Sequence, residues 1–118
     1  MDHLDLIVLG GYYGKGKWTN LISQFLLGVA VKAEQVDLPV EFFSFVRVGS
    51  GYSQQELLAL QQRLNCHWKR WDKTHPPPMI HCTKEIPDCW IEPNESVILE
   101  VISNFIFLRF IHLNLATF

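Results

Sequence analysis

Short apolar runs alternate along the chain with clusters of glycine, proline and polar residues, a pattern that predicts strands more often than helices. Strands are expected over 4–9, 21–31, 40–48, 89–92 and 96–102, with one more over 104–113. The range 21–31 is long enough for a helix, but Gly28 and the β-branched Val29 and Val31 favour a strand. The first run is expected to stop at Gly10-Gly11, which leaves a long loop over 10–20.

One segment has the pattern of an amphipathic helix. Ser53 and Glu56 have the spacing of a capping box, in which each side chain bonds the other residue's backbone N–H. The predicted helix ends near Asn65, and its apolar stripe is formed by Leu57, Leu58, Leu60, Gln61 and Leu64.

The order of these elements indicates a fold class. Three strands, one helix and a closing hairpin that turns at 93–95 form the succession of an OB-fold, a five-stranded Greek-key barrel with a helix after the third strand. The alternating strand and helix pattern of a parallel nucleotide-binding sheet is absent from this prediction. The chain is therefore expected to be mainly β.

Composition narrows the possible functions. The 118 residues are 48% hydrophobic and 19% charged, which is typical of one globular domain. Because the net charge is −2, an anion site has to be a local patch rather than a basic surface. The N-terminus lacks the basic region of a signal peptide. The apolar run 97–115 is interrupted by polar residues, which favours buried strands over a membrane-associated tail.

The three cysteines, Cys66, Cys82 and Cys89, form no CxxC pair and suit a reducing compartment. A zinc site made from these cysteines and nearby histidines is conceivable, but the short ligand pairs usual for zinc are missing. Buried thiols and solvent-facing histidines are the simpler interpretation.

Two segments combine basic and aromatic residues. The first is the loop Gly14-Lys15-Gly16-Lys17-Trp18, whose glycines permit close approach of the backbone to a polyanion. The second is 68–73, in which Lys69, Arg70 and Lys73 alternate with tryptophans. Lysine and arginine pair with phosphates while aromatic rings cover sugars and bases, so two such segments on one barrel indicate nucleic-acid binding.

Other interpretations of these segments remain open. The lysines of the loop could be merely solvated, and the second segment could be a connector with its tryptophans under the barrel. Residues 11–17 also fit the phosphate-binding pattern G-x-x-x-x-G-K. Against a nucleotide site, Trp18 stands where a magnesium-binding hydroxyl is required, and Tyr12 and Tyr13 are bulky where backbone amides would wrap a phosphate.

Three motifs carry a resemblance to a known family. The runs LDLIVLGGYYGKGKW, RVGSGYSQQEL and PDCWIEPNESVILEV occur in that order between Leu4 and Val101. They resemble the C-terminal OB domain of eukaryotic ATP-dependent DNA ligases. The forms GGYYGKG and WKRWDKTHPPP are most similar to the family member that seals double-strand breaks by non-homologous end joining.

The resemblance implies a nuclear location and a ligase reaction in which an upstream adenylation domain supplies a nucleophilic lysine, with ATP and Mg²⁺ as cofactors. The OB domain of such an enzyme closes over duplex DNA at a nick or end and faces the adenylation domain. No catalytic residue, metal ligand or cofactor site is then expected in this chain, and no membrane partner. The DNA-binding residues implied are Lys15, Lys17, Gly14, Gly16, Arg47, Lys69 and Arg70.

The sequence also departs from the family. Residues 1–103 are expected to form the OB domain, whereas 104–118 diverge after Leu108-Arg109-Phe110 and lack the family's last motif. Either this tail supplies the missing barrel strand or it leaves an edge open. Without the adenylation domain the chain alone is expected to be inactive. The alternative is a free-standing nucleic-acid-binding OB module with no ligase role.

Overall fold

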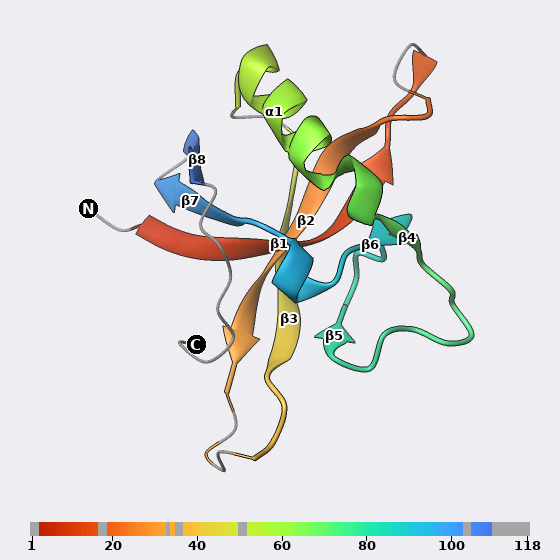
Figure 1. Cartoon of the computed structure of the whole chain (residues 1–118), viewed down its shortest axis with the longest axis vertical. Helices are drawn as coiled ribbons and strands as arrows, with labels where there is room; N and C mark the ends of the chain where they lie inside the picture. The colour runs from red at the N-terminus through yellow and green to blue at the C-terminus, as the bar shows by residue number, and fades with distance from the viewer. Residues whose placement is uncertain are drawn as a thin grey trace.

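A computed structural model of the chain describes residues 3–16, 19–32, 34, 37–49, 52–102 and 105–109. It is mainly β, with one curled, mixed sheet and one helix that lies across an end of the sheet (Figure 1). The strands are β1 (His3–Tyr13), β2 (Ile22–Val31), β3 (Glu41–Val48), β4 (Lys69–Arg70), β5 (Ile80–His81), β6 (Cys89–Trp90), β7 (Ile98–Ile102) and β8 (Phe105–Arg109). The predicted OB-like architecture is confirmed, with two two-residue strands, β4 and β5, beyond the six expected.

Helix α1 (Gln54–Leu64) forms as the sequence predicts. The Glu56 backbone N–H donates to the Ser53 hydroxyl over 3.1 Å, and the Ser53 N–H donates to the Glu56 carboxylate over 2.9 Å. Leu60 and Leu64 are fully buried against the sheet, while Leu58 is 54% exposed. Including Leu58 in the apolar stripe was therefore wrong, because consecutive helical positions lie about 100° apart and Leu58 is turned to solvent.

Strand β1 is the centre of the sheet because its apolar run is buried on both faces. Leu6 and Val8 belong to a core cluster under α1, whereas Ile7 and Leu9 belong to a second cluster on the opposite face. Residues of the 71–82 segment, Trp71, Met79 and Ile80 among them, pack into this second cluster. Burial on both faces explains why the run lacks the polar–apolar alternation of a half-exposed strand.

The expected end of β1 at Gly10-Gly11 was wrong, because the strand continues to Tyr13. Both glycines pair with β2 and β6. A Cβ at Gly10 would lie 2.6 Å from Pro87, and one at Gly11 would lie 2.6 Å from Ile22. Here glycine permits close packing inside a strand instead of ending it, and the loop to β2 is correspondingly shorter.

The expected closing hairpin was also wrong in its pairing. β6 and β7 run in the same direction along one edge of β1, with β6 opposite Gly10-Gly11 and β7 opposite His3–Ile7. The 3₁₀ turn Pro93–Glu95 interrupts them without reversing the chain. They act as a single interrupted fourth barrel strand.

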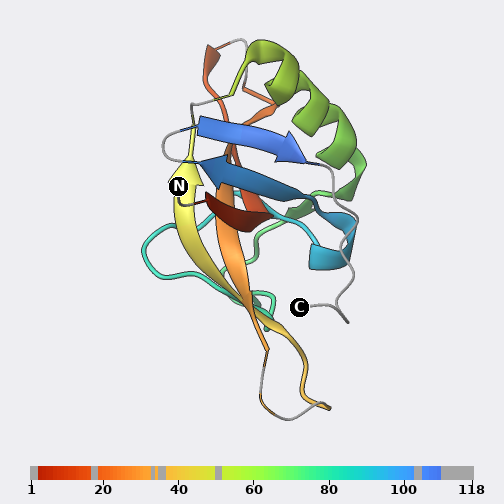
Figure 2. The ribbon, with the colours of Figure 1, turned by 90° about the vertical axis from the view of Figure 1, so that its left-hand side faces the viewer.

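Strand β8, from the divergent tail, forms the hairpin with β7, from Leu99↔Leu108 to Ile102↔Phe105 (Figure 2). The tail thus supplies a fifth strand. Within the described ranges β8 and β3 do not pair, so the sheet curls without closing. No helix in the described part is long and apolar enough to cross a membrane.

Candidate nucleic-acid interface

The glycine–lysine loop joins β1 to β2 at one end of the curled sheet. The Gly14 N–H donates to the Leu21 carbonyl over 3.0 Å, and the Thr19 N–H donates to the Gly16 carbonyl over 3.2 Å. Gly16 has a φ of 61°, in the left-handed region where side chains are strained, so a glycine is needed at this turn. Lys15 is exposed beside it. Lys17 and Trp18 lie outside the described residues.

This loop is not built like a phosphate-binding loop. The element that follows it is strand β2, whereas such a loop needs a helix whose N-terminal amides face the phosphates. Strand β1 is antiparallel to each of the strands that it pairs with in the described part. The nucleotide interpretation of residues 11–17 is therefore excluded by the topology.

The second basic-aromatic segment lies beside the end of β1. Strand β4 pairs with β6, with Lys69 opposite Trp90 and Arg70 opposite Cys89, and β6 in turn pairs with Gly10-Gly11 of β1. Because Gly11 has no side chain, the Trp68 indole approaches to within 3.0 Å of where its Cβ would lie. The second segment is thus brought beside the end of β1, from which the glycine–lysine loop continues.

The end of β1 and the 68–73 segment line neighbouring hollows. A groove of about 560 Å³ is bounded by Tyr13, Trp68, Arg70, Trp71, Lys73, Pro87, Asp88 and Cys89. Tyr13 and Trp68 also line a neighbouring hollow, with Asn20, Leu21, Ile22, Gln61 and Asn65. Tyr13 is half exposed, and its backbone N–H donates to the Asp88 carboxylate over 3.0 Å. We call the union of these two hollows the aromatic groove.

The structure divides the predicted cations into paired and free groups. Arg47 donates to Gln24 over 2.7 Å and to Glu85 over 3.1 Å, and its guanidinium lies 3.7 Å from the Tyr12 ring centroid. Lys69 donates to Glu92 over 3.1 Å, with its ammonium 5.1 Å from the Trp90 ring centroid. A phosphate would have to compete with a carboxylate at either residue.

Lys15, Arg70 and Lys73 are different, because none of the three forms a hydrogen bond or ion pair with another described residue. Lys73 lines the groove beside Arg70 but was not among the predicted site residues, nor was Tyr13. The signal for Lys73 was its place in the segment 68–73. Tyr13 gave no comparable signal, since the predicted strand ended before it.

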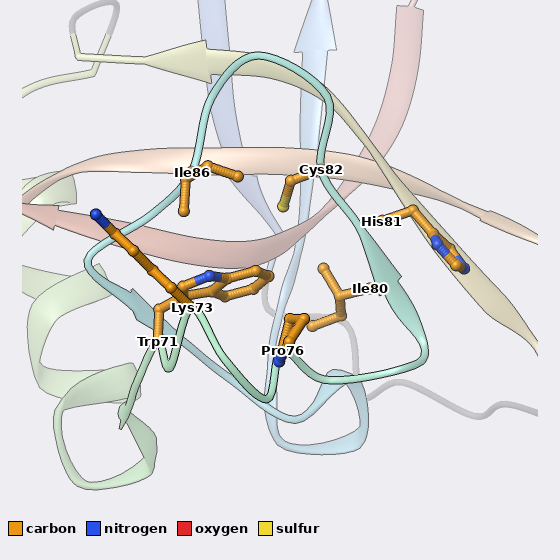
Figure 3. Close-up of a pocket in the computed structure, with 7 residues that line it drawn as sticks. All are labelled: Trp71, Lys73, Pro76, Ile80, His81, Cys82 and Ile86. Carbon is orange, nitrogen blue, oxygen red and sulfur yellow. The ribbon is translucent and has the colours of Figure 1, made fainter.

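Trp71 and Lys73 also line an apolar pocket of about 350 Å³ on the other side of the 71–88 segment. Figure 3 shows Cys82 and Ile86 turned towards the Trp71 indole, while the His81 ring points away. That ring stacks on Phe43 and pairs with Glu41 over 2.9 Å, which fixes β5 beside β3. His81 therefore has a structural role.

The thiols and histidines do not assemble a metal centre in the described residues, where no three His, Cys, Asp or Glu side chains are grouped. Cys89 is buried, Cys66 is exposed, and burial raises the pKa of the Cys82 thiol. The Nδ1 atom of His67 lies 2.9 Å from the Glu95 carboxylate.

Beneath Arg47, the Tyr12 side chain is 5% exposed, and its hydroxyl has no hydrogen-bond partner among the described residues. Burial raises the pKa of this phenol from 10.0 to about 12. Tyr52, which packs against the core cluster under α1, provides a comparison. Burial raises its pKa to about 12 as well, but its hydroxyl donates to the Ser23 carbonyl over 2.7 Å.

We expect Tyr12→Phe to increase the free energy of unfolding by about 1 kcal/mol, because it removes an unpaired buried hydroxyl and keeps the ring under Arg47. Tyr52→Phe should instead lower it by about 1 kcal/mol, since a made hydrogen bond is lost. Urea unfolding at neutral pH measures both. A decrease for Tyr12→Phe would show that its hydroxyl has a partner in solution.

The raised tyrosine pKa values also set the sign of a pH effect. The stability that the neutral phenols contribute is fully present below pH 10. It is lost as the pH rises from 10 towards 12, because the tyrosines of the unfolded chain lose their protons at a lower pH than those of the folded chain. The Tyr12→Phe chain should therefore show a shallower loss across that range.

No family model matches the chain. DNA ligase 4 of Gallus gallus is 44% identical over 101 residues, covering 86% of this chain and 11% of that protein, and DNA ligase 4 of Homo sapiens is 41% identical with the same coverage. DNA ligase 4 of Arabidopsis thaliana is 38% identical over 107 residues, which covers 86% of this chain and 9% of that protein. The chain spans about a tenth of the length of these relatives.

Proposed function

The chain corresponds to one segment of the eukaryotic DNA ligase 4 proteins, and from this relationship we propose that it is the OB-type DNA-binding part of an ATP-dependent DNA ligase. In this proposal it holds duplex DNA at a nick or end by sequence-independent contacts. The adenylation domain of the same enzyme faces it, and the work takes place in the nucleus, in the joining of broken DNA ends.

The observation that carries the proposal is the placement of free cations at one end of the sheet. Lys15 is on the β1–β2 loop, and Arg70 and Lys73 are on the segment that β6 pairs beside the end of β1. All three are exposed. Unpaired lysine and arginine side chains can release condensed counterions from a phosphate backbone, which is the main source of sequence-independent affinity.

The cofactors of the proposed enzyme do not fit this chain's described residues. Mg²⁺ prefers several oxygen ligands, and no three His, Cys, Asp or Glu side chains are grouped in the described part. The glycine–lysine loop leads into a strand, so it offers no helix N-terminus to the phosphates of ATP. The 118 residues also contain no K-x-D-G nucleophile motif. The proposal therefore assigns DNA binding to these residues and routes no step of the ligation through them.

Changing Lys15 and Lys17 together to alanine tests the proposal. If each lysine neutralises one phosphate, the slope of log K against log[salt] for a blunt duplex should fall in magnitude by about 1.8. Fluorescence anisotropy with a labelled hairpin duplex at several salt concentrations measures it. The matched control is Arg63→Gln with Lys84→Gln, which removes two exposed cations that line neither hollow of the aromatic groove. A slope equal to that of the control would remove the loop from the interface.

A further inference from the structure

The aromatic groove has features that a contact with the duplex backbone does not require. A duplex presents phosphates and sugars on its outside, and exposed cations are sufficient to bind them. The groove instead combines half-buried indoles with free cations: Trp68 and Trp71 each pack on a core cluster on one side and line the groove on the other. Fixed aromatic surfaces beside cations are suited to unstacked bases.

The groove carries both cations and a carboxylate. Arg70 and Lys73 flank Trp71, and the three together with Asp72 line a hollow that adjoins the groove. The Asp72 carboxylate is already hydrogen-bonded within its own turn. It accepts from the Thr74 N–H over 2.9 Å and from the Thr74 hydroxyl over 2.6 Å. Its charge reduces the local positive potential without blocking the two cations.

Asp88 lies beside Trp71, whose backbone N–H donates to the Asp88 carbonyl over 3.1 Å. Its carboxylate is held by the Tyr13 N–H and would repel a phosphate. A carboxylate can accept a hydrogen bond from a base amino group, however. In the neighbouring hollow, the Gln61 amide donates to the Ile22 carbonyl over 2.7 Å, and Asn20 and Asn65 lie exposed on its rim. Phosphates are therefore favoured at Arg70 and Lys73, and bases are favoured at Tyr13, Trp68 and Asp88.

From this arrangement we propose that the aromatic groove binds unpaired nucleotides, the single-stranded tail of a DNA end, by stacking bases on Trp71, Trp68 and Tyr13 while Arg70 and Lys73 hold the phosphates. The site is separate from the duplex contacts of the glycine–lysine loop, although Tyr13 is only two residues from Lys15. A tail that leaves a duplex held by that loop would enter the groove directly.

The test compares the whole chain on two labelled hairpins, one blunt and one with a thymidine tail of about eight nucleotides, a length within the range that OB folds bind. The tail should strengthen binding about tenfold. Arg70→Gln with Lys73→Gln should reduce the tail's salt slope by about 1.4, while the Arg63→Gln and Lys84→Gln control leaves it unchanged. Equal affinity for the two hairpins would overturn the proposal.

A second pair of variants separates stacking from packing. Trp71→Leu keeps the apolar contact with the core but removes the aromatic face, so the gain from the tail should be lost. Trp71→Phe retains a ring and should keep most of the gain. If both variants remain folded by circular dichroism and retain the tail's effect equally, stacking is excluded. If a polyglutamate of matched charge displaces the tail as well as an unlabelled strand does, the groove is only a charged surface.

The two proposals fail separately. Loss of blunt-duplex binding in the Lys15→Ala and Lys17→Ala chain, with the tail's gain retained, supports both. An unchanged blunt-duplex slope with the tail's gain retained contradicts the loop's role and leaves the groove standing.

Discussion

The change Gly28→Ala should lower the free energy of unfolding by about 3 kcal/mol, a large fraction of an ordinary domain's stability. Gly28 lies in β2, opposite Ile7 of β1 and Ser44 of β3, next to an irregularity in the β2–β3 register. A Cβ here would lie 2.4 Å from the Phe43 carbonyl oxygen and 2.3 Å from Leu9 Cδ1. The carbonyl belongs to the backbone of the adjacent strand, so this steric clash can be relieved only if the two strands separate.

Gly49→Ala is the matched control for this prediction. The three atoms nearest to the added Cβ all belong to the Gln24 side chain, at 3.0–3.1 Å. This side chain can shift, at most at the cost of its exposed hydrogen bond from Arg47. We expect it to cost less than about 1 kcal/mol. Urea unfolding with an unchanged m value measures both substitutions. Equal and small effects would mean that β2 and β3 lie farther apart at Gly28 than the structure shows.

The elements that the sequence predicts well are those whose signals are local. The capping box of Ser53 and Glu56 fixes the start of α1 through contacts three residues apart, and a residue pattern can contain all of that information. The aromatic and β-branched run of β3 is likewise a local property. The succession of three strands and a helix was therefore predictable, and with it the OB-like class.

The end of β1 was not predictable, because glycine within an apolar run has two opposite meanings. Gly10 and Gly11 could have ended the strand, as expected, or could have made space for neighbours. Pro87 and Trp68 occupy that space, and both come from a segment more than fifty positions away in sequence. The same long-range pairing with β1 determines that β6 and β7 act as one interrupted strand instead of forming a hairpin.

The candidate site was predictable as a set of segments but not as a set of free charges. The 68–73 segment does lie beside the end of β1, from which the glycine–lysine loop continues. Whether each cation is available depends on distant carboxylates: Glu85 for Arg47, and Glu92 for Lys69. No local pattern contains those pairings. The structure therefore shifts the expected phosphate contacts towards Lys15, Arg70 and Lys73.

This end of the sheet depends on the packing of α1. Gln61 donates from the helix to the Ile22 carbonyl at the start of β2, and Asn65, just after the helix, lines the aromatic groove. Two leucines, Leu60 and Leu64, are the fully buried anchors of the helix in the core cluster. The position of the groove wall is thus coupled to how firmly these leucines pack.

Leu60→Ala should consequently lower the free energy of unfolding by about 2–5 kcal/mol, through lost apolar burial and the cavity left behind. Leu58→Ala is an internal control of identical chemistry on the same helix. Because Leu58 is 54% exposed, its loss should cost less than about 0.5 kcal/mol. Chemical unfolding monitored by circular dichroism compares the two. Similar costs at both positions would mean that α1 is rotated from the position described. If the helix positions the groove, Leu60→Ala should also weaken binding of a single-stranded tail under conditions where the chain is still folded, whereas Leu58→Ala should not.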